Sequence, residues 1–362
     1  MTKDRLDEAR KVINEADRVI AEAFEKRMKA AEIVADYKRE RGLPILDTQR
    51  EAEVIRRNSD YVISPEIREY YVKLCEELMA HSRAYQERLL SGMKVAYSGA
   101  PGAFAHIAAG RIFPTCELVS YKSFEEAYGA VVSGECDAAV LPIENSSFGE
   151  VGQVTDLMFS GPLYVNAVEE MEIVHDLLGA PGAALSDIKR VVSHPQALGQ
   201  CAEYIREKGF STEEYSNTAE AARYVLESGD KSLAAIASAE AAATLGLEVL
   251  ERRVNTQSAN TTRFAVFSRA RRDYPAGKSG VHTVLLFTVR NEAGALAKAI
   301  DIIGKHGFNM RSLRSRPMKE LLWEYYFYVE AEGNLASAEG ASMLAELGDC
   351  CDRLKAVGSF VK

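Results

Sequence analysis

The sequence is poor in cysteine and lacks the spacings that build disulfide frameworks or metal sites. Its 362 residues include 6 cysteines, with no CxxC pair among them. We therefore expect a reduced, cytoplasmic protein with no structural metal. No apolar run approaches the length of a membrane span, and residues 1–5 open a charged segment where a signal peptide has an apolar core. The sequence thus predicts a soluble chain with no membrane partner.

Positive charge is also in short supply, which argues against general nucleic-acid binding. The chain carries 44 Lys and Arg against 53 Asp and Glu, a formal net charge of −9. Neutralising a phosphate backbone needs a basic surface, so any anionic ligand must be held by cations placed locally. The turn at residues 99–102 lacks the GxGxxG pattern, and no lysine-bearing P-loop occurs. No nucleotide, metal or redox cofactor is implied.

Glycine and proline are nearly absent from the first 90 residues, which predicts an all-helical module. Apolar residues step by threes and fours over 4–41, which predicts one helix about 55 Å long. Asp47 can cap a second helix that reaches about residue 58, and Ser64 precedes a third that reaches about residue 90. One very long helix and two shorter ones predict an intertwined dimer. The apolar seam of the first helix consists of Leu6, Ala9, Ile13, Ala16, Ile20, Ala23, Ala30 and Val34.

Two cations lie on this core-facing seam, where a charge is costly unless it meets an anion. Arg27 and Lys38 are about 20° apart around the helix, whereas Arg10 is about 100° away, so a partner chain's Arg10 would have to complete any pocket. The second helix adds Asp47, Arg50 and Glu51, and the third adds Ser82 and Gln86 on one face. Periodicity alone leaves two alternatives open, an anion site or a helical dimer with paired charges.

In residue types and order, this set resembles the active site of the all-helical chorismate mutases. The resemblance implies that chorismate, a dianion, rearranges without a nucleophile while the site holds a compact conformer and stabilises the breaking ether bond. Lys38 and Gln86 would donate to the ether oxygen, and Glu51 would hold the hydroxyl. The implied substrate-binding residues are Arg10 from the partner, Arg27, Asp47, Arg50 and Ser82.

Residues 92–270 alternate strand and helix signals, which predicts an α/β region large enough for two lobes. An apolar run reads as a buried strand that ends at Pro142 and is followed at once by Glu144, Asn145 and Ser146. Polar groups at the carboxyl end of a buried strand are where open α/β sheets bind ligands. The alternative is a solvated junction between strand and loop.

The same region resembles prephenate dehydratase over its whole length. The matching segments are Tyr97–Phe104, Leu141–Ser146, Ser193–Leu198, Asn217–Ala222 and Asn260–Phe264. The resemblance implies two α/β lobes, like type II periplasmic binding proteins, with the site in the cleft. Thr262 would lie beside the leaving hydroxyl, and Glu144 would be its ionisable partner if the cleft raises the carboxyl pKa.

The remaining cleft residues follow from the same resemblance. Arg263 would bind a substrate carboxylate. The turn that begins at Ser98 would bind one as well, since turn amides at a helix start attract anions. Asn145, Ser146, Asn217 and Thr218 would orient the substrate. Arg263 could instead belong to a structural ion pair. For His106 and His194 we favour a scaffolding role over an acid role.

A polar linker over 271–280 leads into a βαββαβ pattern, which is ferredoxin-like. Residues 281–362 resemble the ACT regulatory domain, an α+β fold. Gly294, Ala295 and Leu296 match its effector turn, and Ser315 and Arg316 belong to the second effector motif. That motif normally begins with glutamate, whereas Arg314 stands here, and this reversed charge departs from the effector site of the family. The resemblance implies L-phenylalanine as the effector; the alternative is a dimerisation domain without effector.

Together these segments predict a multidomain enzyme with modules at 1–91, 92–270 and 281–362, assembled as a homodimer or a higher homo-oligomer. The chain resembles the bifunctional chorismate mutase/prephenate dehydratases, which make phenylpyruvate from chorismate by way of prephenate. Two alternatives remain. One is a non-catalytic amino-acid sensor, and the other is a dehydratase that prefers arogenate, which differs from prephenate by an amino group.

Overall fold

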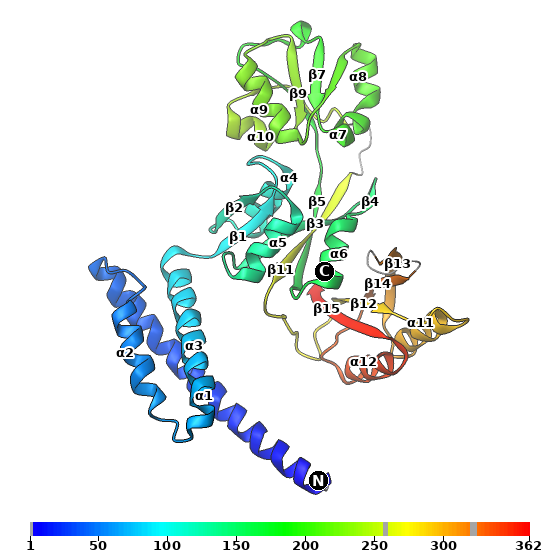
Figure 1. The fold of residues 1–362 in the computed structure, drawn as a ribbon. Coiled ribbons are helices and arrows are strands. Elements are labelled where there is room, and N and C mark those ends of the chain that lie inside the picture. Colours follow the sequence, from blue (N-terminus) through cyan, green and yellow to red (C-terminus); the bar gives the residue numbers. More distant parts are fainter. Residues whose placement is uncertain (1–2, 256–259, 319–323) are drawn as a thin grey trace. The chain divides into compact units, whose positions relative to one another are not determined.

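The computed structural model describes residues 3–255, 260–318 and 324–362, divided into two units between Met93 and Lys94 (Figure 1). The first unit holds helices α1 (Lys3–Arg41), α2 (Thr48–Ser59) and α3 (Pro65–Ser91). The three helices predicted from the sequence are confirmed to within one residue at each end. Asp47 caps α2 as expected, since its carboxylate accepts the Arg50 N–H at 2.9 Å.

Only the C-terminal part of α1 packs within the unit. Ala31 and Ala35 are buried against α3, whose own buried residues include Met79 and Ser82. The predicted apolar seam is not part of this packed face. Its residues Leu6, Ile13, Ile20 and Val34 are exposed, and the exposed fraction of Ile20 is 58%. Within the described part of the helical unit, neither α2 nor α3 buries the apolar residues of the first six turns of α1, so this face lies open.

The second unit contains a ten-stranded mixed sheet, whose strands run in the order β13-β14-β12-β15-β5-β11-β3-β1-β2, with β4 paired to β3. Its first lobe comprises β1 (Lys94–Ser98), α4 (Phe104–Ile112), β2 (Glu117–Tyr121), α5 (Phe124–Ser133), β3 (Ala138–Asn145), β4 (Gly149–Glu150), α6 (Gly152–Ser160), β5 (Tyr164–Glu172) and, after an excursion, β11 (Thr261–Ser268).

The chain segment between β5 and β11 forms the second lobe, a five-stranded sheet in the order β10-β6-β9-β7-β8. Helices α7 and α8 cover one face of it, and α9 and α10 cover the other (Figure 1). Its elements are β6 (Asp176–Gly179), a 3₁₀ turn (Leu185–Asp187), β7 (Arg190–Ser193), α7 (Pro195–Gln200), α8 (Ala202–Lys208), β8 (Ser211–Glu214), α9 (Thr218–Ser228), β9 (Leu233–Ala237), α10 (Ala239–Leu245) and β10 (Glu248–Glu251). The expected two-lobed α/β architecture is therefore observed.

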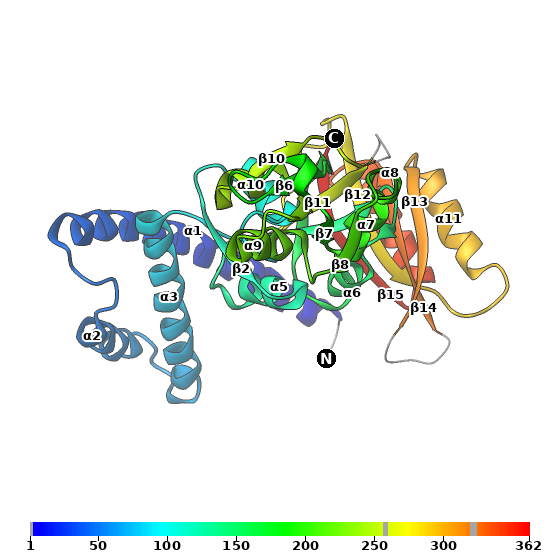
Figure 2. The same ribbon diagram turned by 90° about the horizontal axis from the view of Figure 1, so that it is seen from above.

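The last quarter of the chain has the predicted βαββαβ order. Its elements are β12 (Val281–Thr288), α11 (Ala295–Lys305), β13 (Asn309–Pro317), β14 (Tyr325–Glu332), α12 (Ala338–Cys350) and β15 (Arg353–Val361). The predicted start of the third strand, Leu322, lies outside the described residues. Helices α11 and α12 pack on one face of this part of the sheet, and α11 lies on the side of β13 away from α6 (Figure 2).

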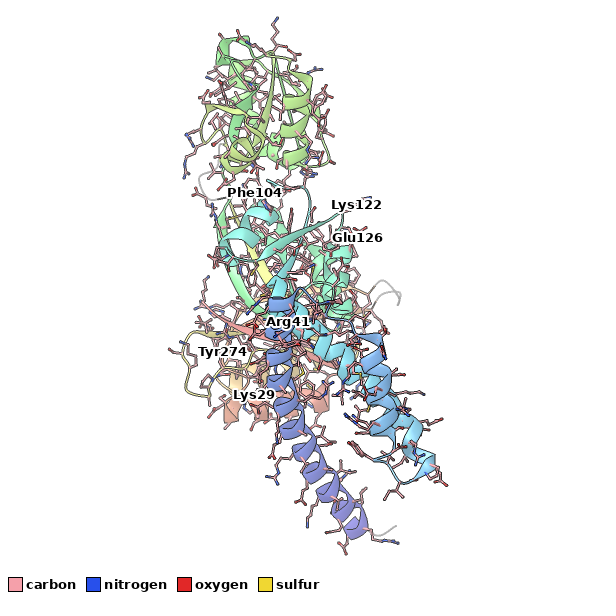
Figure 3. The ribbon with its side chains drawn as sticks, turned by 90° about the vertical axis from the view of Figure 1, so that its left-hand side faces the viewer. Lys29, Arg41, Phe104, Lys122, Glu126 and Tyr274 are labelled. Atoms are coloured by element: carbon pink, nitrogen blue, oxygen red, sulfur yellow. The ribbon has the colours of Figure 1, made fainter. Side chains whose placement is uncertain are left out.

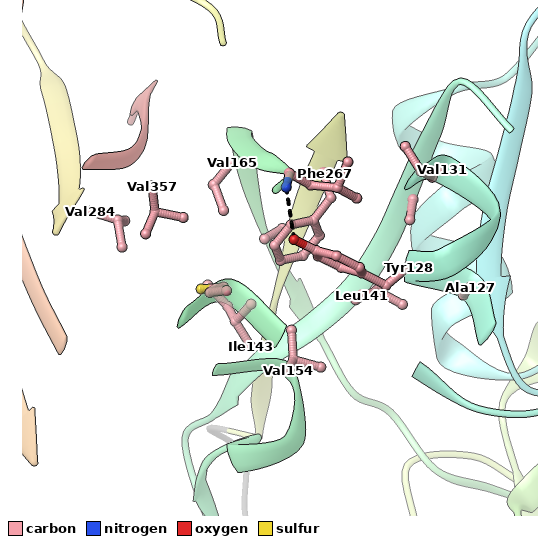
Figure 4. Close-up of a cluster of buried hydrophobic side chains, with 14 of the residues drawn as sticks. Ala127, Tyr128, Val131, Leu141, Ile143, Val154, Val165, Phe267, Val284 and Val357 are labelled. Atoms are coloured by element: carbon pink, nitrogen blue, oxygen red, sulfur yellow. Dashed lines mark hydrogen bonds between the residues drawn. The ribbon is translucent and has the colours of Figure 1, made fainter. Parts of the chain in front are cut away.

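The first lobe and the C-terminal elements share one sheet and one core. Strand β15 runs parallel to β5, and Gly358 faces Val165 so closely that any Cβ there would collide with the Val165 backbone. A hydrophobic cluster joins Leu141 and Phe267 of the lobe to Val284 and Val357 (Figure 4). Within it, the Leu163 N–H donates to the Tyr128 hydroxyl at 2.9 Å, and burial raises the pKa of Tyr128 to about 12.

Strand β3 is longer than the sequence predicts, which changes where its polar residues point. We expected the strand to end at Pro142, but it continues to Asn145. The missing proline N–H is accommodated by a bulge, because Arg263 of β11 pairs with Glu144 and the next residue pairs with Pro142. Since successive strand residues face opposite sides of a sheet, Glu144 and Asn145 point apart.

Candidate functional site

The helical unit holds a cavity of about 150 Å³ in which seven of the eight predicted residues meet. They are Arg27, Lys38, Asp47, Arg50, Glu51, Ser82 and Gln86. The gathering has a simple cause: Arg27 and Lys38 share the face of α1 that packs on α3, and the capped start of α2 closes the third side. Cations from two helices therefore converge on one small space, which suits an anionic ligand.

Two cations of this cavity, Arg27 and Lys38, are held by neutral oxygens, whereas Arg50 pairs with Glu53 at 2.8 Å. Arg27 donates to the Leu78 carbonyl at 3.0 Å and to the Ser82 hydroxyl. Lys38 donates to the Ile45 carbonyl. Because neither cation pairs with a carboxylate in these contacts, both charges remain available to an anion.

Gln86 and Glu51 are fixed by neighbours on α3. The Gln86 amide donates to the Ser82 carbonyl at 3.1 Å and keeps a second N–H, while its Oε1 is buried without a partner. Glu51 accepts from Arg83 at 2.5 Å through each oxygen. Arg83 was not predicted; its position at i+4 from the buried Met79 marks it as a residue of the packed face of α3. It aligns the carboxylate and offsets its charge.

Arg10 does not join this cavity. It lies on the exposed first part of α1, 3.6 Å from Asp7. The sequence predicts that Arg10 completes the pocket of a partner chain, and a single chain does not test that prediction.

The second unit holds a cavity of about 370 Å³ lined by both lobes. Five of the predicted cleft residues line it: Ser98, Asn145, Asn217, Thr218 and Thr262. Ser98 ends β1, Asn217 caps α9 by accepting the Glu220 N–H at 2.8 Å, and Asn145 and Thr262 face each other across β3 and β11. Ser146 is not among the lining residues, since its backbone and hydroxyl both pair with Thr261.

Glu144 and Arg263 correct the prediction for the cleft. They pair with each other at 3.0 Å on the opposite face of the sheet, and Arg263 also binds Glu330 through two bonds of 2.8 and 3.0 Å. Neither lines the cleft, so Glu144 is not placed to ionise beside Thr262 and Arg263 is not placed to bind a substrate carboxylate. The reason is the bulge in β3: Pro142 and Asn145 both line the cleft, so the extra residue between them turns Glu144 to the opposite face. The alternative of a structural ion pair for Arg263 is the one observed.

A chain of hydrogen bonds runs from Thr262 into the second lobe. Asn145 Nδ2 donates to Thr262 Oγ1 and to Asn260 Oδ1, both at 2.9 Å. Asn260 Nδ2 donates to Gln200 Oε1 at 2.9 Å, and His175 Nε2 lies 2.8 Å from the same oxygen. Sequence reasoning missed Asn260, Gln200 and His175. Such residues can be identified from the sequence as polar side chains that directly follow an apolar strand or lie inside a segment that matches the family.

His106 and His194 support the scaffolding interpretation. His106 Nδ1 accepts the Gly102 N–H at 3.1 Å, and His194 Nδ1 accepts the Gln196 N–H at 3.2 Å. Burial lowers the pKa of both imidazoles, which favours their neutral forms. Each therefore holds the start of a helix.

Lys122 is the one residue with a full charge among those that line the cleft in the described part of the chain. It follows β2 and, like Phe104 at the start of α4, lies where the first lobe faces the second (Figure 3). The N-termini of α4 and α9 also border the cavity, at Phe104 and Thr218. An ammonium group and two helix N-termini make this cleft attractive to carboxylates.

The predicted effector residues fall in two places. Gly294 starts α11 with a positive φ of 87°, and Leu296 lines a cavity of about 500 Å³ with Arg290 and Asn291. Ala295 is the first residue of α11, beside that cavity.

Ser315 and Arg316 are not brought to the same cavity. Arg316 donates to Glu150 at 2.6 Å and to Asp156 at 3.1 Å, both in the first lobe. Arg314, the residue that departs from the family motif, binds Glu144. The second motif therefore ties β13 to the first lobe.

Comparisons with known proteins separate the chain at the same place as the structure. The family profile described as Prephenate dehydratase matches residues 95–272, and the one described as Chorismate mutase type II matches residues 9–87. The helical cavity lies inside the second match and the cleft inside the first.

Curated relatives cover one or both parts. A bifunctional chorismate mutase/prephenate dehydratase of Neisseria gonorrhoeae is 33% identical, over 86% of this chain and 85% of the relative. One of Aquifex aeolicus is 30% identical, over 99% of this chain and 98% of the relative. Arogenate dehydratase 2 of Petunia hybrida is 33% identical, over 75% of this chain and 72% of the relative.

Two solved structures resemble the second unit in size and fold. A prephenate dehydratase of Arthrobacter aurescens in complex with L-Phe has a TM-score of 0.69 at 28% identity, covering 74% of this chain and 90% of its own. A chain described as GqqA, a quorum quenching acylase, has a TM-score of 0.69 at 34% identity, covering 74% of this chain and 97% of its own.

Proposed function

The chain belongs to the bifunctional chorismate mutase/prephenate dehydratases, and we propose that its two activities reside in the two cavities described above. It converts chorismate to prephenate and prephenate to phenylpyruvate. The observation that carries the assignment is the meeting of seven residues of mutase type in one helical cavity, separate from the cleft that contains Thr262. An amino-acid sensor would need a binding cleft, but it would not need the cationic cavity of the helical unit.

The mutase step needs a shaped, cationic cavity and no proton transfer. One C–O bond breaks as one C–C bond forms, so the protein contributes by holding the compact conformer and stabilising charge on the ether oxygen. We assign carboxylate binding to Arg27 and Arg50, and donation to the ether oxygen to Lys38 and the second N–H of Gln86. Glu51, aligned by Arg83, holds the substrate hydroxyl; Asp47 and Ser82 complete the wall.

The dehydratase step consumes one proton and releases carbon dioxide and water. The bond to the ring carboxylate breaks and leaves its electron pair in the ring, while the ring hydroxyl departs and is protonated. We assign to Thr262 the hydrogen bond to the leaving hydroxyl. Lys122 and the N-termini of α4 and α9 are placed for the carboxylates, which replaces the role expected of Arg263. Because the same chain makes prephenate, prephenate rather than arogenate is the substrate of this cleft.

We further propose that two chains intertwine through α1. The exposed apolar seam of α1 needs a cover, and Arg10 lies about 25 Å along the helix from Arg27 at 1.5 Å per residue. A second copy of α1 running alongside would bury the seam and bring its Arg10 to the incomplete cavity. Each mutase site would then use residues from both chains.

Mixing two inactive variants tests this shared site. Arg10→Ala and Lys38→Ala chains should each lack mutase activity, whereas a 1:1 mixture should recover about a quarter of the unmodified activity, because half the dimers are hybrids with one intact site. The measurement is chorismate consumption after partial unfolding and refolding of the mixture. No recovery, with subunit exchange verified by differently tagged chains, would contradict the shared site.

We also propose that residues 281–362 form an ACT-like regulatory domain that responds to L-phenylalanine. Support comes from the βαββαβ order, from the turn at Gly294 and from the L-Phe complex of the A. aurescens relative. Arg314 reaches Glu144, which adjoins Asn145 of the cleft, so a displacement of β13 acts directly on β3.

An Arg314→Gln variant tests this coupling. It should bind L-phenylalanine like the unmodified chain but lose most of its inhibition, because the ion pair that links effector domain and cleft strand is gone. Calorimetry measures the binding and dehydratase assays measure the inhibition. Arg311→Gln is the matched control, since Arg311 of the same strand pairs with Glu332 inside the C-terminal elements. Inhibition of Arg314→Gln equal to that of the control would refute the link.

A further inference from the structure

Two backbone N–H groups determine which side chain donates and which accepts in the hydrogen bonds that connect Thr262 to His175. Asn145 Oδ1 accepts the Ser147 N–H at 3.0 Å and the Phe148 N–H at 3.1 Å. A backbone N–H can only donate, so this atom must be the amide oxygen and the other must be the NH₂ group. The orientation of Asn145 is therefore settled by the loop that follows β3.

This orientation propagates across three more side chains. Asn145 Nδ2 donates to Asn260, so the Asn260 atom that faces it is Oδ1. Asn260 Nδ2 then donates to Gln200 at 2.9 Å and to the Ile173 carbonyl at 3.4 Å. Gln200 must present its oxygen to Asn260. That oxygen lies 2.8 Å from His175 Nε2, so Nε2 carries the hydrogen of the imidazole.

Both ends of the chain of bonds face the cleft with a defined role. Thr262 Oγ1 accepts from Asn145, and among the described residues its hydroxyl hydrogen has no acceptor, so it is free to donate. His175 Nδ1 has the lone pair and is buried, with no hydrogen-bond partner among the residues that the structure describes. His175 is 2% exposed, and burial lowers its pKa, which keeps the ring neutral although the buried Asp176 is its sequence neighbour. Native proteins rarely leave a buried polar atom unpaired.

We propose that Asn260 and His175 are positioning residues of the dehydratase: the loop after β3 sets the polarity at Asn145, and these two residues hold Asn145 and Gln200 in it, so that Asn145 donates to Thr262. In this polarity the Thr262 hydroxyl donates toward the ligand, and His175 Nδ1 keeps a buried lone pair. With the opposite polarity, Asn145 would present its oxygen to Thr262. The threonine hydroxyl would then donate to Asn145 and not to the ligand. The role in catalysis rests on the function proposed above, whereas the polarity itself can be measured without substrate.

The tautomer of His175 reports the polarity directly. The full chain labelled with [¹⁵N]histidine is measured at neutral pH without ligand, and the His175 signals are assigned by their absence from His175→Gln. The expected result is a protonated Nε2 and an unprotonated Nδ1. A proton on Nδ1 in the unmodified chain would overturn the proposal, whatever the enzyme does with prephenate.

Asn260→Asp reverses the bonds between residue 260, Gln200 and His175 with almost no change in shape, while Asn145 can still donate to residue 260. The new carboxylate cannot donate, so Gln200 must turn its NH₂ group toward it and toward His175. His175 Nε2 then becomes an acceptor, or the ring becomes charged; in both cases Nδ1 gains a proton. We expect this change in the spectrum together with a fall of at least tenfold in kcat on prephenate and a smaller change in KM.

Two further variants separate positioning from folding. His175→Gln can still donate to Gln200 and should retain most of kcat, whereas His175→Leu should lose kcat as Asn260→Asp does. His306→Gln is the control, since His306 bonds Glu346 in the C-terminal elements. Circular dichroism of each variant reports its folding. Equal kcat for His175→Leu and the control would refute the positioning role, and a dehydratase-inactive unmodified chain would refute the proposed function instead.

Discussion

A Lys38→Ala chain is expected to lose mutase activity by roughly 100- to 1,000-fold, the usual effect of removing a donor aimed at charge that develops in a transition state. Lys38 lies in the helical cavity and donates there to the Ile45 carbonyl, so an anion can take over its hydrogen bonds. Its dehydratase activity on supplied prephenate should be unchanged, because the cleft belongs to the other unit.

Both activities are measured on one preparation, with chorismate and with prephenate as separate substrates. Lys29→Ala is the matched control: Lys29 lies on the same helix, is exposed, and pairs with Glu25 at 2.7 Å (Figure 3). The control should keep both activities. Loss of both activities in Lys38→Ala would mean that the modules are coupled or wrongly assigned.

A Thr262→Val chain is expected to show the opposite pattern, with dehydratase kcat reduced about 100-fold or more and mutase activity intact. The substitution removes the hydroxyl that donates to the ligand and deprives Asn145 of one acceptor. KM should change less than kcat, since the carboxylate-binding groups remain. Thr262→Ser, which keeps the hydroxyl, should recover a large part of kcat.

Thr261→Val is the control for the effect of valine in this strand. Thr261 is the neighbouring residue of β11 and does not line the cleft, so its kinetics should match the unmodified chain. A Thr262→Val enzyme with unchanged kcat would remove Thr262 from the mechanism. Binding of substrate without any turnover, in this variant and in the unmodified chain alike, would favour an amino-acid sensor.

The helical unit could be predicted almost completely from the sequence, because its signals are local. Caps, prolines and a 3.6-residue period define three helices, and the period also places Arg27 and Lys38 on one face. The seam of Leu6 to Val34 has no cover within one chain, which is why periodicity pointed to a partner chain rather than to a core.

The cleft could be predicted only in part, because one strand boundary decides which residues face it. Pro142 looks like a strand end, yet a bulge carries β3 past it to Asn145. The extra residue of the bulge reverses the side of the sheet that the strand residues beyond it face. Asn145 and Thr262 therefore enter the cleft, while Glu144 and Arg263 turn to the C-terminal elements.

The sequence could not show that residues of distant segments meet in one chain of hydrogen bonds. His175, Gln200 and Asn260 come from the second lobe and the returning strand, and only the fold brings them together. Lys122 follows a strand that the sequence did not reveal. Pairings across long stretches of chain leave no local pattern to read.

The most direct test of the account is to give the purified chain chorismate alone and identify the products at neutral pH. The reaction must be stopped without acid, since acid by itself aromatises prephenate. We expect phenylpyruvate, which requires both activities from one chain. Accumulation of prephenate would contradict the assignment of the cleft, and unchanged chorismate would contradict the assignment of the helical cavity.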